Sequence, residues 1–238
     1  DSQDIIQSIE SRKPSEFPSI VKLEPVKRKY FGKPVNAVKV FCQDPDVVAK
    51  YTKAMAKIEG VQESLEDEIR YSMLYLIDNG MSPCGWHEIE VEQTKNTPGV
   101  QVDKLYTAKS FPKSIEKAEP PQLRVLGLST TAYSPKGAPK PEKDPVVIIS
   151  VATNTGEEAQ FVAKSDDKSV LEEFLRYVKD FDPDILVGYG TNRQDWPYLT
   201  TRAQKLGIKL FVDRANTEPH MSVYGHVSVT GRANVDFY

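Results

Sequence analysis

Few side chains in this sequence have a type and spacing that could carry chemistry. The two cysteines, Cys42 and Cys84, lie far apart and form no CxxC pair, so neither a zinc site nor a redox motif is indicated. We expect both thiols to be free and buried. The sequence holds no glycine-rich nucleotide loop, Ser-His-Asp arrangement or cluster of His and Cys ligands, so enzyme classes built on those motifs are not supported.

A short basic run, Lys27-Arg28-Lys29, is a candidate for phosphate contacts. The net charge of −3 argues against an overall basic nucleic-acid binder, although it leaves room for a local basic track. The structural alternative is a solvated charge run beside a strand, and we favour that alternative.

Composition indicates a globular protein that acts away from membranes. Of 238 residues, 39% are hydrophobic and 27% charged, and no apolar run approaches the roughly 20 residues of a bilayer span. The N-terminus Asp1-Ser2-Gln3-Asp4 does not resemble a signal peptide. We expect a cytoplasmic monomer of two domains.

The first half alternates helical and strand patterns, which predicts a small α+β domain. Apolar spacing predicts helices over residues 1–12, 44–60 and 71–78, and strands over 21–30, 35–42 and 61–65. Residues 88–121 are rich in Lys, Glu, Thr and Pro and indicate an extended hairpin or linker. We place the domain boundary at Pro120-Pro121, so the domains are 1–121 and 122–238.

The second half predicts a mixed sheet with helices. Strands are expected at residues 123–128, 145–153, 160–162, 184–189 and 208–212, and helices at about 170–178 and 196–206, with Gly207 as a C-cap. This order matches a ribonuclease H-like fold, which has three antiparallel strands, a helix, a parallel strand and a helix. The expected fold class is therefore mixed α/β and α+β.

Six blocks resemble, in family order, the archaeal family B DNA polymerases. They are Tyr30-Phe31-Gly32-Lys33-Pro34, Tyr75-Leu76-Ile77-Asp78-Asn79-Gly80, Pro145-Val146-Val147-Ile148-Ile149-Ser150, Asp182-Pro183-Asp184-Ile185-Leu186-Val187-Gly188-Tyr189, Asp195-Trp196-Pro197-Tyr198-Leu199 and Arg202-Ala203-Gln204-Lys205-Leu206-Gly207-Ile208. The resemblance implies that residues 1–121 are an N-terminal domain and 122–238 a 3′–5′ exonuclease-type domain.

The resemblance also carries expectations about the parent protein. The family usually has a few dozen residues of strands before the helix at Asp1, and the block Gly231 to Tyr238 resembles one in the middle of the exonuclease domain. We therefore expect the third exonuclease motif and the palm, fingers and thumb to lie outside this sequence. Nucleotidyltransferase chemistry is not expected from the chain alone, and the remaining polymerase domains are its expected partners.

The family's exonucleases hydrolyse the terminal phosphodiester with two divalent metals held by carboxylates. The first motif supplies an Asp and a Glu two residues apart on a strand, so that both face the same side. Ser129 and Thr131 stand at those positions here. Because neutral hydroxyls cannot offset the charge of two divalent ions, we expect no metal, no bound Mg²⁺ and no two-metal catalysis.

The second motif keeps its carboxylate as Asp195, while Gly190 and Gln194 replace the family's Asn and Phe. We interpret Asp195 mainly as an N-cap of the helix that starts at Trp196. Since neighbours of the first motif have changed as well, natural inactivation is favoured over a laboratory substitution. The alternative is a live 3′–5′ exonuclease that recruits Asp144, Asp182 or Asp184.

A pocket that captures uracil in template DNA is another property of archaeal members. Pro45, Val48 and Tyr71 fall on positions that resemble this pocket, and Thr52 stands where a basic residue is common. The simpler interpretation places the first three residues in the hydrophobic core. The expected ligand of the whole chain is single-stranded DNA, template or primer end, bound weakly.

Overall fold

The computed structural model describes residues 1–95, 99 and 101–238. Contacts within these residues form two compact units. The first comprises Asp1–Glu90 with Ser110–Glu116, and the second comprises Val91–Lys109 with Lys117–Tyr238. The expected family domain boundary at Pro121 stays a prediction, since contacts define compact units and not family domains.

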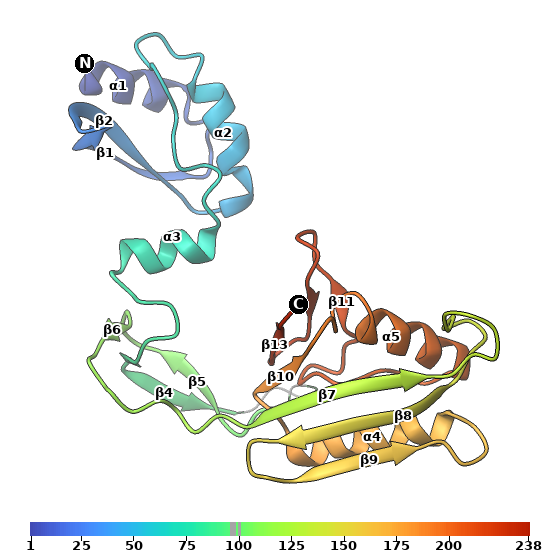
Figure 1. Cartoon of the computed structure of the whole chain (residues 1–238). Helices are drawn as coiled ribbons and strands as arrows, with labels where there is room; N and C mark the ends of the chain where they lie inside the picture. The colour runs from blue at the N-terminus through green and yellow to red at the C-terminus, as the bar shows by residue number, and fades with distance from the viewer. Residues whose placement is uncertain (96–98, 100) are drawn as a thin grey trace. The chain divides into compact units, whose positions relative to one another are not determined.

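The first unit begins with helix α1 and an antiparallel hairpin, as predicted (Figure 1). The Asp1 carboxylate caps α1 by accepting from Gln3 N. The elements in chain order are α1 (Ser2–Arg12), β1 (Ile20–Tyr30), β2 (Lys33–Cys42), the 3₁₀ turn η1 (Pro45–Val47), α2 (Val48–Met55), α3 (Tyr71–Asp78), β3 (His87–Glu88) and β6 (Lys113–Ser114).

Aromatic and aliphatic side chains from α1, β1 and α2 form the core of the first unit. Phe17 meets Tyr51 edge to face, with ring centroids 5.2 Å apart, and the Tyr51 hydroxyl accepts from Ser19 N at 3.1 Å. The buried members are Ile9, Phe17, Ile20, Tyr51, Met55 and Ile58. Burial of this apolar surface, rather than helix propensity, holds the short α2 in place.

Three predictions for the first unit are wrong. Helix α2 ends at Met55 and not at Gly60, because Lys57 N and Ile58 N bond three residues back and form turns that still bury Ile58. Residues 61–65 are not a strand. The expectation of two buried thiols also fails, since Cys42 is half-buried and Cys84 is exposed, although both are free.

The second unit is built on a five-stranded mixed sheet in the order β13-β10-β7-β8-β9. Strands β7, β8 and β9 are antiparallel, while β10 runs parallel to both β7 and β13. The strands are β7 (Val125–Ala132), β8 (Val146–Thr153), β9 (Glu158–Val162), β10 (Ile185–Gly188) and β13 (Ala233–Asp236), with short pairs β4 (Val91–Thr94) with β5 (Leu105–Ala108) and β11 (His220–Met221) with β12 (Val227–Ser228). The β4–β5 pair confirms the expected hairpin, although residues 96–98 and 100 of that range lie outside the described residues.

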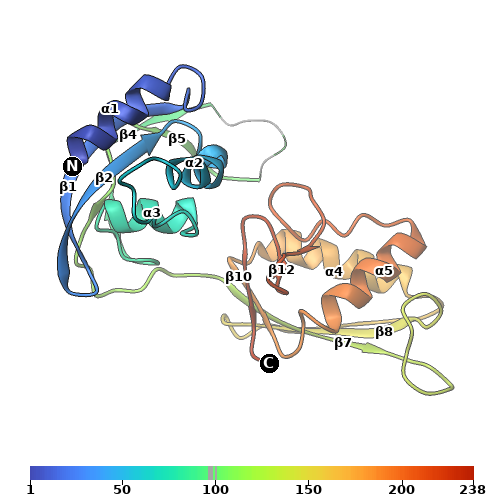
Figure 2. The same cartoon turned by 90° about the horizontal axis from the view of Figure 1, so that it is seen from above.

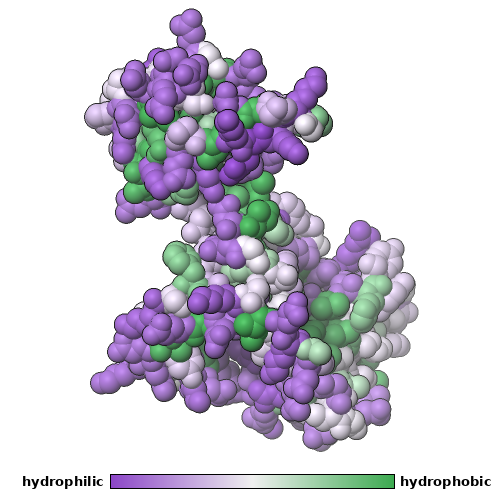
Figure 3. All heavy atoms as spheres, turned by 90° about the vertical axis from the view of Figure 1, so that its left-hand side faces the viewer, coloured by the Kyte–Doolittle hydropathy of each residue, from purple (hydrophilic) through white to green (hydrophobic). Residues whose placement is uncertain are grey.

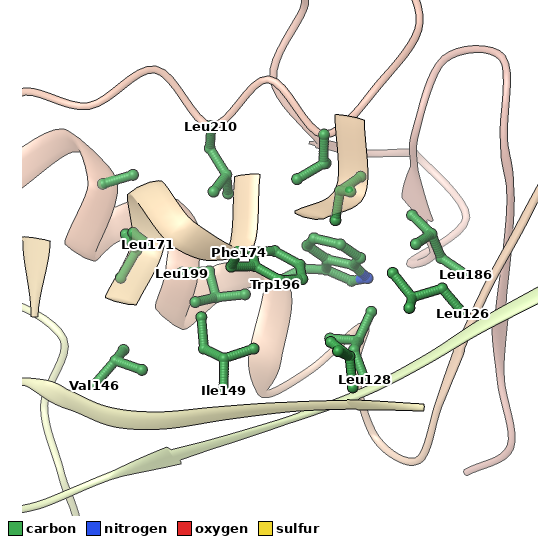
Figure 4. Packing of buried hydrophobic residues seen from close by; sticks show 14 of the residues in the cluster. Leu126, Leu128, Val146, Ile149, Leu171, Phe174, Leu186, Trp196, Leu199 and Leu210 are labelled. Carbon is green, nitrogen blue, oxygen red and sulfur yellow. The ribbon is translucent and has the colours of Figure 1, made fainter. Parts of the chain in front are cut away.

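Helices α4 (Lys168–Phe181) and α5 (Asp195–Leu206) lie on the same side of β7 and β8 (Figure 2). The largest buried side chain, Trp196, packs with Phe174 among aliphatic residues from the sheet, including Leu126, Ile149 and Leu186 (Figure 4). Gly207 ends α5 in the left-handed conformation at φ 69°, as predicted. The order of a ribonuclease H-like fold is therefore confirmed.

The predicted strand at residues 208–212 is wrong. Leu210 and Val212 are fully buried, which accounts for the apolar alternation. Their backbone groups, however, bond locally: Val212 N donates to Leu210 O, and Leu210 N donates to the Glu218 carboxylate. An extended segment without a neighbouring strand forms no ladder.

Hydrophilic residues cover most of the face shown in Figure 3. Across the described part of the chain, every helix is too short or too polar to span a bilayer.

Candidate functional site

Asp195 reaches strand β7 between the two positions of the first motif. Its Oδ1 accepts from the Thr130 backbone N at 2.9 Å and from the Thr130 hydroxyl. Asp195 is 7% exposed and is the first residue of α5, which follows β10 after a six-residue loop. The fold therefore brings the retained carboxylate to the Ser129–Thr131 segment, as the order of motifs predicts.

The expected N-cap role of Asp195 is wrong. Gln194 occupies the N-cap position of α5 and makes no side-chain capping bond. The carboxylate bonds to Thr130 on the sheet instead. Sequence reasoning missed Thr130, and the only signal for it was its place between the two motif positions.

Ser129 and Thr131 alternate with Thr130 along β7, so both side chains face away from the helix-covered core. Both are exposed, whereas Leu128 before them is buried. Ser129 shares a shallow hollow on this open face of the sheet with Ser150 of β8 and Gln160 of β9, which pair across the strands. The hydroxyls thus meet solvent.

The loop from β10 into α5 is held by residues from the far end of the chain. Asp236 accepts from Gly190 N at 2.6 Å and from Asn192 N at 2.8 Å. Partial burial would raise the pKa of Asp236, but these amide donors outweigh burial and hold the pKa below its ordinary value. Asp236 belongs to the last matching block, to which the sequence assigned no role.

Glycines let this loop pass close to the sheet. A Cβ on Gly188 would overlap Thr191 Cγ2 and lie 3.0 Å from Leu128 O, so only glycine fits there. Gly190 adopts φ 73° and stands where the family has Asn. Gln194 replaces the family's Phe and lies against Gly190. A Cβ added to Gly190 would contact the side-chain amide of Gln194.

The carboxylates of the alternative hypothesis are engaged elsewhere. Asp182 binds Arg214 at 2.9 Å and Arg232 at 2.7 Å, and Asp184 binds Arg214 at 2.9 Å. These groups lie at the start of β10, the opposite end from Asp195. Asp144 accepts from Lys140 N at 2.7 Å.

Among the described residues, no group of three or more His, Cys, Asp or Glu side chains is placed to hold a metal ion. The Asp195 carboxylate bonds to β7 within the Ser129–Thr131 segment. Its Oδ1 accepts two hydrogen bonds from Thr130. Hard divalent cations are held by several oxygen ligands, with carboxylates supplying the charge. One buried carboxylate with neighbouring hydroxyls is a poor fit to a pair of such ions.

The uracil-pocket candidates lie at element starts in the first unit. Pro45 opens η1, Val48 opens α2 and Tyr71 opens α3. Pro45 is exposed, Val48 is half-buried, and Tyr71 is 66% exposed. The simpler interpretation as core residues is therefore wrong for Pro45 and Tyr71, while uracil capture stays a prediction.

Comparison with known families decides what this arrangement is. The profile described as "DNA polymerase family B, exonuclease domain" matches residues 63–165 and 153–238. The chain belongs to DNA polymerase family B. Its mixed sheet is the exonuclease-type fold of family B.

Archaeal family B relatives match nearly the whole chain. "DNA polymerase 2" of Aeropyrum pernix is 38% identical over 223 residues, which cover 91% of this chain and 28% of that protein. "DNA polymerase 3" of Saccharolobus shibatae is 32% identical over 89% of this chain and 28% of its own length. The chain thus spans less than a third of the relatives it matches.

A solved family B structure is also similar. The family B DNA polymerase from the hyperthermophilic archaeon Pyrobaculum calidifontis superposes with a TM-score of 0.83 and 40% identity. The match covers 96% of this chain and 30% of that one. This likeness confirms the predicted resemblance.

Proposed function

We propose that this chain is a non-hydrolytic part of a family B DNA polymerase, which holds single-stranded DNA or braces the polymerase portion. The observation that carries the proposal is the Asp195 carboxylate bonded to Thr130, with hydroxyls at Ser129 and Thr131 on either side. The proposed partners are DNA and the remaining polymerase domains. We propose a cytoplasmic location and a monomeric state.

The charge balance of the site supports this proposal. Two divalent ions bring four positive charges, and a phosphodiester supplies one negative charge, so the protein must provide most of the compensation. Asp195 provides one carboxylate, and Ser129 and Thr131 provide none. An oxygen that already accepts from Thr130 N and the Thr130 hydroxyl is also less available to a metal.

Exonuclease measurement tests the proposal. A 5′-labelled oligonucleotide is incubated with the chain in millimolar Mg²⁺ or Mn²⁺, and we expect no shortening from the 3′ end. Asp195→Ala serves as the matched variant and should be indistinguishable. Shortening that chelator abolishes and Asp195→Ala removes would overturn the proposal.

The same assay addresses the alternative, a live exonuclease with substitute carboxylates. Metal-dependent shortening that survives Asp195→Ala but is lost in Asp144→Asn, Asp182→Asn or Asp184→Asn would favour that alternative. The arginine partners of Asp182 and Asp184 argue against it, because a cation would have to displace guanidinium groups already paired to both carboxylates.

A further inference from the structure

The tip of the β1–β2 hairpin combines cations with a solvent-facing ring. Hairpin tip here means residues 27–33. Between Val26 and Asn36 the sequence carries Lys27, Arg28, Lys29 and Lys33 and no carboxylate. All four cations are exposed, and the core of the first unit contacts the other end of the hairpin, at Leu23 and Val40.

Phe31 occupies a position that its side chain does not favour. It lies in the two-residue turn between Tyr30 and Lys33, with φ 46°, followed by Gly32 at φ 78°. Two positive φ values in a two-residue hairpin loop define a type I′ turn, which favours Asn, Asp or Gly. A bulky residue in the left-handed region is strained, and such strain points to a function when packing does not explain it.

Packing does not explain Phe31, because 89% of the side chain is exposed. Its main neighbour is Tyr30, which meets it edge to face with ring centroids 4.6 Å apart. The Glu63 carboxylate lies near the Tyr30 hydroxyl and raises the pKa of that hydroxyl. The edge contact with Tyr30 leaves the Phe31 ring largely open to solvent.

Two of the cations share a face of the hairpin with the Tyr30 ring. Arg28 lies two residues before Tyr30 on that face of β1, and Lys33 is the cross-strand partner of Tyr30, while Lys27 and Lys29 lie on the opposite face. Glu24, the nearest carboxylate along β1, is engaged by Lys22. A ring for a base, flanked by cations for phosphates, is the combination that proteins use for single strands.

We propose that the hairpin tip binds single-stranded DNA, with Phe31 stacking on an unpaired base and Arg28 and Lys33, on the face of Tyr30, contacting the adjacent phosphates. Unpaired bases are required because duplex bases offer no free face. The inference rests on the proposed function in taking DNA as the ligand. It assigns the contact to the first unit and not to the exonuclease-like sheet of the second unit.

Phe31→Asn is the decisive variant, because its structural and binding effects have opposite signs. The Asn-Gly pair suits the type I′ turn, so the melting temperature should stay equal or rise. Loss of one stacked base should weaken binding of a fluorescein-labelled oligothymidylate at least about fivefold, measured by anisotropy with the 238-residue chain. Binding of a blunt duplex should change less.

The salt dependence gives a second readout. Arg28→Gln with Lys33→Gln should lower the slope of log affinity against log salt by about 1.4 for a single strand. Lys53→Gln with Lys57→Gln removes the same charge from exposed positions of the first unit and should leave the slope unchanged.

The outcomes distinguish failure of the hairpin site from failure of the proposed function. If the chain binds the oligonucleotide and neither hairpin variant differs from its control, the hairpin proposal falls and the proposed function stands. If the chain binds no single strand even at low salt, both the hairpin site and the DNA-holding function fall. Metal-dependent exonuclease activity would instead overturn the proposed function alone.

Discussion

Arg202 of α5 and Asp167, directly before α4, form a buried, two-pronged ion pair. Arg202 Nε donates to Asp167 Oδ2 at 2.7 Å and Nη2 donates to Oδ1 at 2.8 Å. Val146 N donates to Oδ2 at 3.0 Å, so the pair also ties β8 to both helices. Burial alone would raise the pKa of Asp167, but the hydrogen bonds from Arg202 and Val146 hold it below its usual range.

Removal of one partner should therefore destabilise the second unit. We expect Arg202→Leu to lower the free energy of unfolding by about 3–5 kcal/mol, because it leaves the Asp167 charge buried without a cation. Urea denaturation followed by circular dichroism measures this. Lys205→Ala, at an exposed position of α5, should change it by less than about 0.5 kcal/mol. Equal effects of the two variants would contradict the structural role of the pair.

Acid should destabilise the chain through its depressed carboxylates. Burial raises the pKa of Asp182, but hydrogen bonds from Arg214 and Arg232 more than compensate, and its folded pKa lies below the ordinary value. The unfolded chain then binds protons first, so this stability is present above about pH 4 and is lost as pH falls toward the folded pKa. Denaturation midpoints measured from pH 7 to pH 2.5 should show the loss.

Asp182→Asn provides the control for this pH dependence. The variant should be less stable at pH 7, because Arg232 loses an anionic partner at a side chain that is 1% exposed. Its stability should also decline less steeply below pH 4. An unchanged acid slope would show that Asp182 does not contribute.

Thr130 and not Thr131 should be coupled to Asp195. Thr130→Val removes the hydroxyl donor to a carboxylate that is 7% exposed, and we expect a loss of about 1–3 kcal/mol. Thr131→Val at the exposed neighbouring position should cost less than about 0.5 kcal/mol. In a double-mutant cycle, Thr130→Val should cost little once Asp195 is Ala. Additive losses of unfolding free energy in the double mutant would contradict the coupling of Thr130 to Asp195.

Metal should affect stability only after carboxylates are restored. An ion without a site cannot stabilise by linkage, so Mn²⁺ should leave the melting temperature of the chain unchanged. Ser129→Asp with Thr131→Glu should lower it without metal, through carboxylate repulsion, and make it rise with Mn²⁺. Ser150→Asp with Ala152→Glu places the same spacing on the same open face of β8, and it separates a specific effect of the β7 positions from the effect of added charge. A rise of several degrees in the unmodified chain would contradict the loss of the site.

The sequence predicted most regular elements, because their apolar periodicity reports which face is buried. Helix α4 and strand β8 follow their patterns closely, and Gly207 marks the end of α5. The two predicted strands that failed have one physical origin. Residues 61–65 and 208–212 carry apolar residues, but a strand also needs a hydrogen-bonded neighbour, and that is a property of the fold rather than of the segment.

The candidate site was predictable in position but not in contacts. Motif order placed Asp195 near Ser129 and Thr131, whereas its actual partner, Thr130, could not be read from residue types. The role of Asp236 was hidden for a similar reason, since it acts on amides of Gly190 and Asn192 more than 40 residues earlier. Local propensity carries no information about contacts that long-range packing creates.

The strand order has a consequence for how the chain emerges during synthesis. Strands β7, β8 and β9 are consecutive and can pair as soon as they leave the ribosome, but the other edge of β7 waits for β10. Until then the backbone donors and acceptors on that edge, beside Leu126, are open to pairing with another nascent chain. The polar Ser129 and Thr131 further along β7 shorten the apolar stretch of that strand. A nascent chain with these hydroxyls therefore exposes less apolar surface for association with another chain.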